Sequence, residues 1–328
     1  MAEERTLVQH DDTLGDVTGD ERLVDGDTVE RVVDELQSGE PVWFELPWLP
    51  EGRTVQVPGR GEFFVRQFRH RDPGAPVLAL FHGWTATCDL QFFTAYEALA
   101  ERYSFVAIDH RGHGRGLRTL QPFELEDAAD DMAAVLRRLG IDRVTTVGYS
   151  MGGPISMLFA RRHPELVEAM VVQATALEWS ATWRERLTWM WLPVLGAVLR
   201  SWAYPRYLRR QIAKLIPVGH ELGRYLPWIV GEMHRGYPHA LVEAGRALRH
   251  YDARPWVAQL DVPVAMLLTS RDRLVRPRKQ RELARAVRAD VHELRGDHFC
   301  TIAQPSEYSA ATVALVDRVR GRLGSALA

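Results

Sequence analysis

The chain has 328 residues, of which 46% are hydrophobic and 26% charged, with a formal net charge of −2. This near-neutral balance gives no electrostatic basis for nucleic-acid binding. The two cysteines, Cys88 and Cys300, are too few for a disulfide framework and lack metal-ligand spacing. The length predicts one large core domain with a smaller insertion or appendage.

The first 40 residues form an acidic arm, with thirteen Asp and Glu against three Arg. The arm has neither the basic nor the apolar region of a signal peptide, and with the scarce cysteines this indicates a cytoplasmic protein. A capping-box pattern, Asp27-Thr28-Val29-Glu30, predicts one short helix there. We interpret residues 1–52 as an acidic N-terminal extension.

From about residue 53, short continuous apolar runs are typical of strands buried on both faces of a parallel sheet. The predicted strands lie at 62–68, 77–81, 105–108, 144–147, 167–172, 262–268 and 290–294. Helical patterns accompany them at 89–101, 125–139, 153–163, 277–288 and 306–323. This alternation predicts an α/β fold with a doubly wound, mostly parallel sheet.

The alternation stops between about 176 and 258, in a segment that contains seven of the ten Trp and reads as helical. We predict a helical cap or lid over the carboxyl edge of the sheet, where open α/β folds bind ligands. The core then consists of 53–175 and 259–328. The most apolar run, Trp189 to Leu199, is too short to cross a bilayer, so no membrane span is expected. This run forms either the core of the cap or a lipid-facing surface.

The most specific motif is Gly148-Tyr149-Ser150-Met151-Gly152, between a predicted strand and a predicted helix. A Gly-x-Ser-x-Gly in this context is typical of a nucleophile elbow, a strained turn that exposes a serine. Gly148 and Gly152 support the turn because they remove Cβ atoms that would clash. Ser150 is therefore the candidate nucleophile.

A serine hydroxyl needs a base, and the base needs an orienting acid. His298 is the candidate base because it follows the last predicted strand and can reach the elbow. It must be neutral to act, so activity should fall in acid. Asp272, in the loop after strand 262–268, is the candidate acid. Asp297 and Glu178 remain rivals for that role.

An oxyanion hole needs two N–H donors aimed at the carbonyl oxygen on which charge develops. Met151 supplies one backbone N–H, and Trp84 is the candidate for the other, beside Gly83, which allows close backbone approach. The cluster Asp109-His110-Arg111-Gly112-His113-Gly114 superficially suggests a metal site. We interpret it instead as a Gly-rich turn whose Asp and Arg hold neighbouring loops, so neither a metal nor another cofactor is expected.

Together these segments resemble the α/β-hydrolase superfamily. The matching motifs, in the order and spacing of the family, are HGW at 82–84, DHRGHG at 109–114, GYSMGG at 148–153, SRDRLV at 270–275 and GDHF at 296–299. The resemblance implies a serine-nucleophile, cap-domain branch that includes esterases and lipases. It carries over the triad Ser150, Asp272 and His298 and the oxyanion hole of Trp84 and Met151.

The implied activity is hydrolysis of carboxylic esters of small or medium apolar acyl groups through an acyl-enzyme on Ser150. A lactonase, a carbon–carbon bond hydrolase and a cofactor-free perhydrolase use the same triad and remain alternatives, as does acyl transfer. A slow-turnover ligand receptor is the non-enzymatic alternative. The expected partner is a small acyl substrate, with lipid-surface contact through the cap also open; no signal for an oligomeric state is present.

Overall fold

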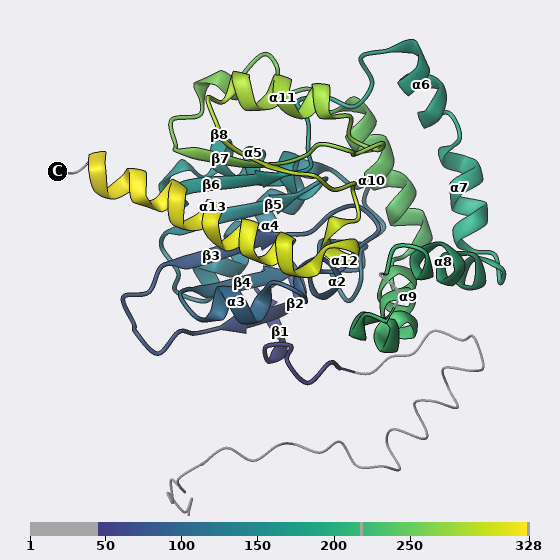
Figure 1. Ribbon diagram of the computed structural model, residues 1–328, viewed down its shortest axis with the longest axis horizontal. Helices are drawn as coiled ribbons and strands as arrows, with labels where there is room; N and C mark the ends of the chain where they lie inside the picture. The colour runs from purple at the N-terminus through teal and green to yellow at the C-terminus, as the bar shows by residue number, and fades with distance from the viewer. Residues whose placement is uncertain (1–44, 217–218, 327–328) are drawn as a thin grey trace, which may run out of the picture. The chain divides into compact units, whose positions relative to one another are not determined.

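The computed structural model describes residues 45–216 and 219–326. At its centre is an eight-stranded sheet with the strand order β1-β2-β4-β3-β5-β6-β7-β8 (Figure 1). The strands are β1 (Gly52–Val57), β2 (Gly61–Phe68), β3 (Val77–Phe81), β4 (Ser104–Ile108), β5 (Val144–Tyr149), β6 (Val167–Gln173), β7 (Val264–Thr269) and β8 (Asp290–Leu294). Strands β1 and β2 are antiparallel to their neighbours, and β3 to β8 are parallel to one another. The predicted fold class is therefore confirmed.

Helices cover both faces of this sheet. They are α2 (Cys88–Phe92), α3 (Tyr96–Ala100), α4 (Leu125–Arg138), α5 (Gly152–Arg162), α11 (Pro277–Ala286), α12 (Cys300–Ala303) and α13 (Pro305–Ala326). Side chains of β3 alternate between two cores: Ala79 and Phe81 pack with α4 and α5, whereas Leu78 and Leu80 pack with α3 and α13. Every residue of β5 and β7 is buried, which explains why these strands are mostly apolar; the exceptions in β5 are the buried Thr145 and Thr146.

Two expectations about local structure were incomplete or wrong. Strand β1 was not predicted, because its polar residues alternate with Val55 and Val57, the only two that are buried. The predicted helix at 89–101 is wrong, since two helices, α2 and α3, occupy this range. The chain turns between them at residues 93–95, where the Ala95 N–H donates to the Phe92 carbonyl over 2.8 Å. The predicted helix near residue 27 lies outside the described residues.

The segment between β6 and β7 is helical. It contains α6 (Trp183–Trp189), α7 (Leu192–Leu199), α8 (Tyr204–Ala213), α9 (Leu226–His234) and α10 (Pro238–His250), with 3-10 turns at Glu221–Tyr225 and Val257–Gln259. A further 3-10 turn, Pro164–Leu166, lies directly before β6. Figure 1 shows α6, α7 and α8 beyond α10, which packs against α4 of the core. The two ends of the insertion meet where the Ala253 N–H donates to the Leu177 carbonyl.

The inserted helices are attached to loops at the carboxyl edge of the sheet. The indole N–H of Trp84, in the loop after β3, donates to the Leu241 carbonyl of α10 over 2.8 Å. The hydroxyl of Thr87 donates to the buried carboxylate of Glu232 on α9 over 2.6 Å. This arrangement places α9 and α10 beside the loop that follows β3. Within the described ranges, no helix is both long and apolar enough to span a bilayer.

Candidate active site

Ser150 occupies the turn between β5, which ends at Tyr149, and α5, which begins at Gly152. Its φ of 51° lies in the left-handed region, which costs a residue with a side chain about 1–3 kcal/mol. A Cβ at Gly148 would collide with the Gly152 carbonyl, and a Cβ at Gly152 with the carbonyl of Phe81. Only glycine fits at both positions, and the turn presents Ser150 at the amino end of a helix, where the dipole favours negative charge.

Three side chains from distant parts of the sequence form one hydrogen-bonded chain. His298 Nε2 lies 3.0 Å from Ser150 Oγ, across 148 positions of sequence. His298 Nδ1 lies 2.7 Å from Asp272 Oδ2, and Asp272 is buried. A histidine protonated on Nδ1 satisfies both contacts, because it donates to the carboxylate and leaves Nε2 to accept from the serine hydroxyl.

The loop after β3 lies against the serine turn. A Cβ on Gly83 would stand 3.4 Å from Ser150 Cβ, and Thr85 has a left-handed φ of 61°. Among the described residues, the backbone N–H groups of Trp84 and Met151 have no acceptor. Two donors beside the serine are thus free for a ligand atom.

A family model described as the alpha/beta hydrolase fold matches residues 76–205. A pimeloyl-[acyl-carrier protein] methyl ester esterase from Neisseria meningitidis serogroup C is 30% identical over 208 residues, which cover 61% of this chain and 76% of that relative. The chain belongs to the α/β-hydrolase superfamily. A bifunctional esterase/perhydrolase from Acinetobacter calcoaceticus is 32% identical over 115 residues, or 34% of this chain and 41% of that one.

Solved structures share the fold of this α/β-hydrolase. The enol-lactonase from Burkholderia xenovorans LB400 superimposes with a TM-score of 0.69 at 21% identity, covering 81% of this chain and all of that one. An esterase from Thermogutta terrifontis gives a TM-score of 0.67 at 19% identity, covering 82% and 99%. The chain is therefore a hydrolase by family, and its own site must indicate which bond it cleaves.

The carboxylate of Asp272 in this hydrolase is held from both sides. Its Oδ1 accepts the backbone N–H groups of Leu274 and Val275, each over 2.8 Å. Its Oδ2 accepts the Thr269 hydroxyl over 2.9 Å, and the Gln280 amide nitrogen lies 3.3 Å from it. Thr269 and Gln280 were not predicted as site residues, since nothing in the local sequence distinguishes them from other polar residues near a strand end.

The two rival acids are engaged elsewhere. Glu178 forms an ion pair with Lys279 over 2.8 Å and accepts two backbone N–H groups that follow it in the chain. Asp297 accepts the backbone N–H of Phe299 over 2.8 Å in a local turn. Of the three candidate carboxylates, it is therefore Asp272 that the structure brings to His298.

His82 and the Gly-rich cluster after β4 brace the loops around the site. His82 Nδ1–H donates to the Gly83 carbonyl and Nε2 accepts the His110 N–H, each over 2.8 Å, while burial lowers the pKa of His82. Asp109 accepts the backbone N–H and the guanidinium of Arg115. Across the described residues, no cluster of His, Cys, Asp or Glu could hold a metal ion.

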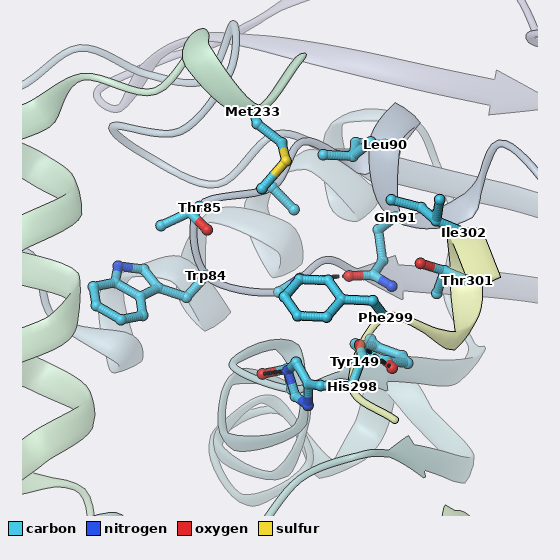
Figure 2. A pocket seen from close by; sticks show the side chains of 13 residues that line it. Trp84, Thr85, Leu90, Gln91, Tyr149, Met233, His298, Phe299, Thr301 and Ile302 are labelled. Carbon is cyan, nitrogen blue, oxygen red and sulfur yellow. Dashed lines mark hydrogen bonds between the residues drawn. The ribbon is translucent and has the colours of Figure 1, made fainter. Parts of the chain in front are cut away.

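A cavity of about 70 Å³ opens beside the serine (Figure 2). It is lined by Gly83, Trp84, Thr85, Ala86, Leu90, Gln91, Tyr149, Ser150, Met233, His298, Phe299, Thr301 and Ile302. Figure 2 shows Leu90 and Met233 across the cavity from His298, and Met233 comes from α9 of the insertion. One water needs about 10–15 Å³ by the same measure, so the cavity accommodates about five to seven heavy atoms.

Proposed function

We propose that this α/β-hydrolase cleaves carboxylic esters through an acyl-enzyme on Ser150, with His298 as general base and Asp272 as the acid that orients it. The observation that carries the proposal is the continuous chain of contacts from Ser150 Oγ to His298 Nε2 and from His298 Nδ1 to Asp272 Oδ2, at 3.0 and 2.7 Å. Each donor and acceptor in this chain matches the direction in which a proton must move.

In the first half of the reaction, Ser150 Oγ bonds to the ester carbon and its proton passes to His298 Nε2. The carbonyl oxygen becomes an oxyanion, which the Trp84 and Met151 N–H groups stabilise. When the carbon–oxygen bond of the ester breaks, His298 gives the proton to the leaving alcohol. Asp272 stays ionised throughout and stabilises the imidazolium.

In the second half, water takes the place of the alcohol. His298 accepts a proton from this water as its oxygen bonds to the acyl carbon, and returns the proton to Ser150 Oγ as the acid departs. The relatives named as esterases support this chemistry, whereas the names of the enol-lactonase and of the esterase/perhydrolase indicate that proteins of this fold also carry out other reactions. The largely apolar cavity beside the triad favours hydrolysis of an ester with an apolar acyl group.

The cavity size supports short acyl groups. Leu90, Met233 and Ile302 form its apolar wall, and the cavity volume is only about 70 Å³. Acyl chains longer than a few carbons must therefore displace side chains. Among para-nitrophenyl esters, we expect the highest kcat/KM for acetate and butyrate and a loss of about tenfold or more for decanoate, because each poorly accommodated methylene group costs free energy.

A matched variant sharpens this measurement. Met233→Ala shortens the wall opposite the triad and should move the optimum toward longer chains without changing the acetate rate by more than about threefold. A wild-type optimum at long chains, or an optimum that Met233→Ala leaves in place, would contradict the assignment of this cavity to the acyl group.

We further propose that the outer face of the inserted helices docks on an anionic lipid surface. Only part of the apolar run from Trp189 to Leu199 is buried, namely Leu192, Gly196 and Leu199. The outward side chains of α6 and α7 and of the loop after α7 are exposed. The exposed face comprises Trp183, Leu187, Met190, Trp191, Val194, Val198 and Trp202, with exposed fractions of 64%, 68% and 79% for its three Trp. Residues 183–214 carry seven Arg or Lys and one Glu.

Apolar side chains with surrounding basic groups are typical of interfacial helices. Two copies pairing through this face would bring like charges together, which disfavours self-association. We expect the protein to float with phosphatidylglycerol vesicles more than with phosphatidylcholine vesicles, and to be released by salt. Replacing Trp183, Trp191 and Trp202 by Ser should abolish flotation. Dimers in sedimentation without flotation would assign the face to a second copy instead.

A further inference from the structure

A second, larger space adjoins the candidate active site. A groove of about 630 Å³ is lined by residues of the loops after β7 and β8, and it shares His298 and Phe299 with the small cavity beside the serine. The loop after β7 carries Asp272 and the loop after β8 carries His298. Leu215 of the insertion and Ala303 and Gln304 at the end of α12 complete the lining. The groove therefore lies against the elements that position the base and its acid.

Three arginines line this groove: Arg271, Arg273 and Arg295. Each side chain is exposed, and none forms an ion pair or a side-chain hydrogen bond with any residue in the described part of the chain. The only carboxylate in the lining is that of Asp297, which accepts a backbone N–H in its own turn. The groove thus offers three unpaired guanidinium groups against one carboxylate.

What distinguishes these three arginines is that they surround one groove beside the candidate active site. Buried arginines are held by carboxylates, as Arg66 is by Asp89 and Glu45, whereas exposed arginines such as Arg71 and Arg200 also form no ion pair with the described residues. Guanidinium groups recognise carboxylates and phosphates through paired hydrogen bonds, so three of them around one groove form a ready anion-binding surface. The exposed apolar side chain of Leu274 lies in the same lining, next to Arg273.

The direction of proton transfer indicates which half of an ester reaches the groove. His298 donates its proton to the leaving oxygen, so the leaving group must lie on the side of the imidazole. The groove borders that imidazole and is about nine times larger than the acyl cavity, at 630 against 70 Å³. We propose that the groove is the leaving-group subsite, and that it selects esters whose alcohol carries a carboxylate or a phosphate. This inference rests on the proposed ester hydrolase.

The test compares acetate esters of matched phenols that differ in the para substituent: a methyl group, a carboxymethyl group or a phosphate. Rates are divided by the hydroxide-catalysed rate of each ester. We expect kcat/KM for the two anionic esters to exceed that of the neutral one by about tenfold, mainly through KM, with the advantage falling as salt is added. The larger of the two advantages identifies carboxylate or phosphate as the preferred anion.

Arginine-to-glutamine variants test whether the groove causes the preference for anionic esters. Arg295→Gln, and the triple change of Arg271, Arg273 and Arg295 to Gln, should bring the anionic-to-neutral ratio toward one. Arg71→Gln, an exposed arginine between β2 and β3, serves as the matched control and should keep the wild-type ratio. The anionic-to-neutral ratio is taken within each variant. A general loss of catalysis, caused by replacing Arg271 or Arg273 beside Asp272, affects both esters and cancels in this ratio.

Three outcomes would overturn the inference while leaving the ester hydrolase intact: a wild-type ratio of one, a ratio that survives the triple change, or a preference for para-tolyl succinate, whose anion is on the acyl half.

If no ester is hydrolysed, the proposed function fails instead. Binding of para-hydroxyphenyl phosphate and para-hydroxyphenylacetate to the Ser150→Ala protein, measured by calorimetry, then decides the groove separately. Binding that the triple change weakens supports it, and absence of binding rejects it.

Discussion

Ser150→Ala should lower kcat for para-nitrophenyl acetate by about 10⁴–10⁶-fold, the range expected when the nucleophile of a triad is removed. The left-handed turn and the helix amino end remain in the variant, so binding should be largely retained. What is lost is the oxygen that lies 3.0 Å from His298 Nε2 and forms the bond to the acyl carbon. Initial rates and the mass of the acyl adduct trapped at early times measure the effect.

Ser156→Ala is the matched control for this change. Ser156 is buried on α5, and its hydroxyl donates to the Gly153 carbonyl over 2.9 Å within one turn of the same helix. Its rate should remain within about threefold of the wild type, as expected for a site outside the reacting atoms. Residual activity in Ser150→Ala at the wild-type level, without an adduct, would point to direct attack by a water activated by His298.

Asp272→Asn should lower kcat by about 10⁴-fold with little change in KM. The backbone N–H groups of Leu274 and Val275 fix the acceptor Oδ1, so the asparagine must place its carbonyl there and its NH₂ group toward His298 Nδ1. An NH₂ group in that position favours the histidine tautomer protonated on Nε2. That tautomer cannot accept the Ser150 proton.

Glu178→Gln tests the rival acid directly. In the wild type Glu178 forms an ion pair with Lys279, so replacing its carboxylate by the amide of Gln should reduce thermal stability. The rate of the folded variant should stay within about threefold of the wild-type rate. The tautomer change in Asp272→Asn is observable independently through the ring-nitrogen NMR shifts of His298. A large loss in Glu178→Gln with normal rates in Asp272→Asn would transfer the orienting role to the loop after β6.

Several features of the molecule were readable from local sequence because their causes are local. Strands buried on both faces are largely apolar, so β7 stands out as an apolar run from Val264 to Leu268, and β5 is recognisable although it includes Thr145 and Thr146. A serine turn with Gly148 and Gly152 also follows from short-range sterics, and its left-handed φ is present at Ser150. By contrast, β1 has an exposed, polar face, and its pattern did not distinguish it from a loop.

The sequence by itself determined the α/β architecture, the position of the serine turn and a short set of candidate bases and acids. The sequence favoured Asp272 as the acid but left Glu178 and Asp297 as rivals, and only the tertiary structure shows which of the three carboxylates contacts His298, because all three lie in loops near strand ends. Gln280, Met233 and the unpaired arginines of the groove likewise carry no local signal. Their roles arise from contacts across the sheet edge, where the strand order, and not the spacing in sequence, decides which side chains meet.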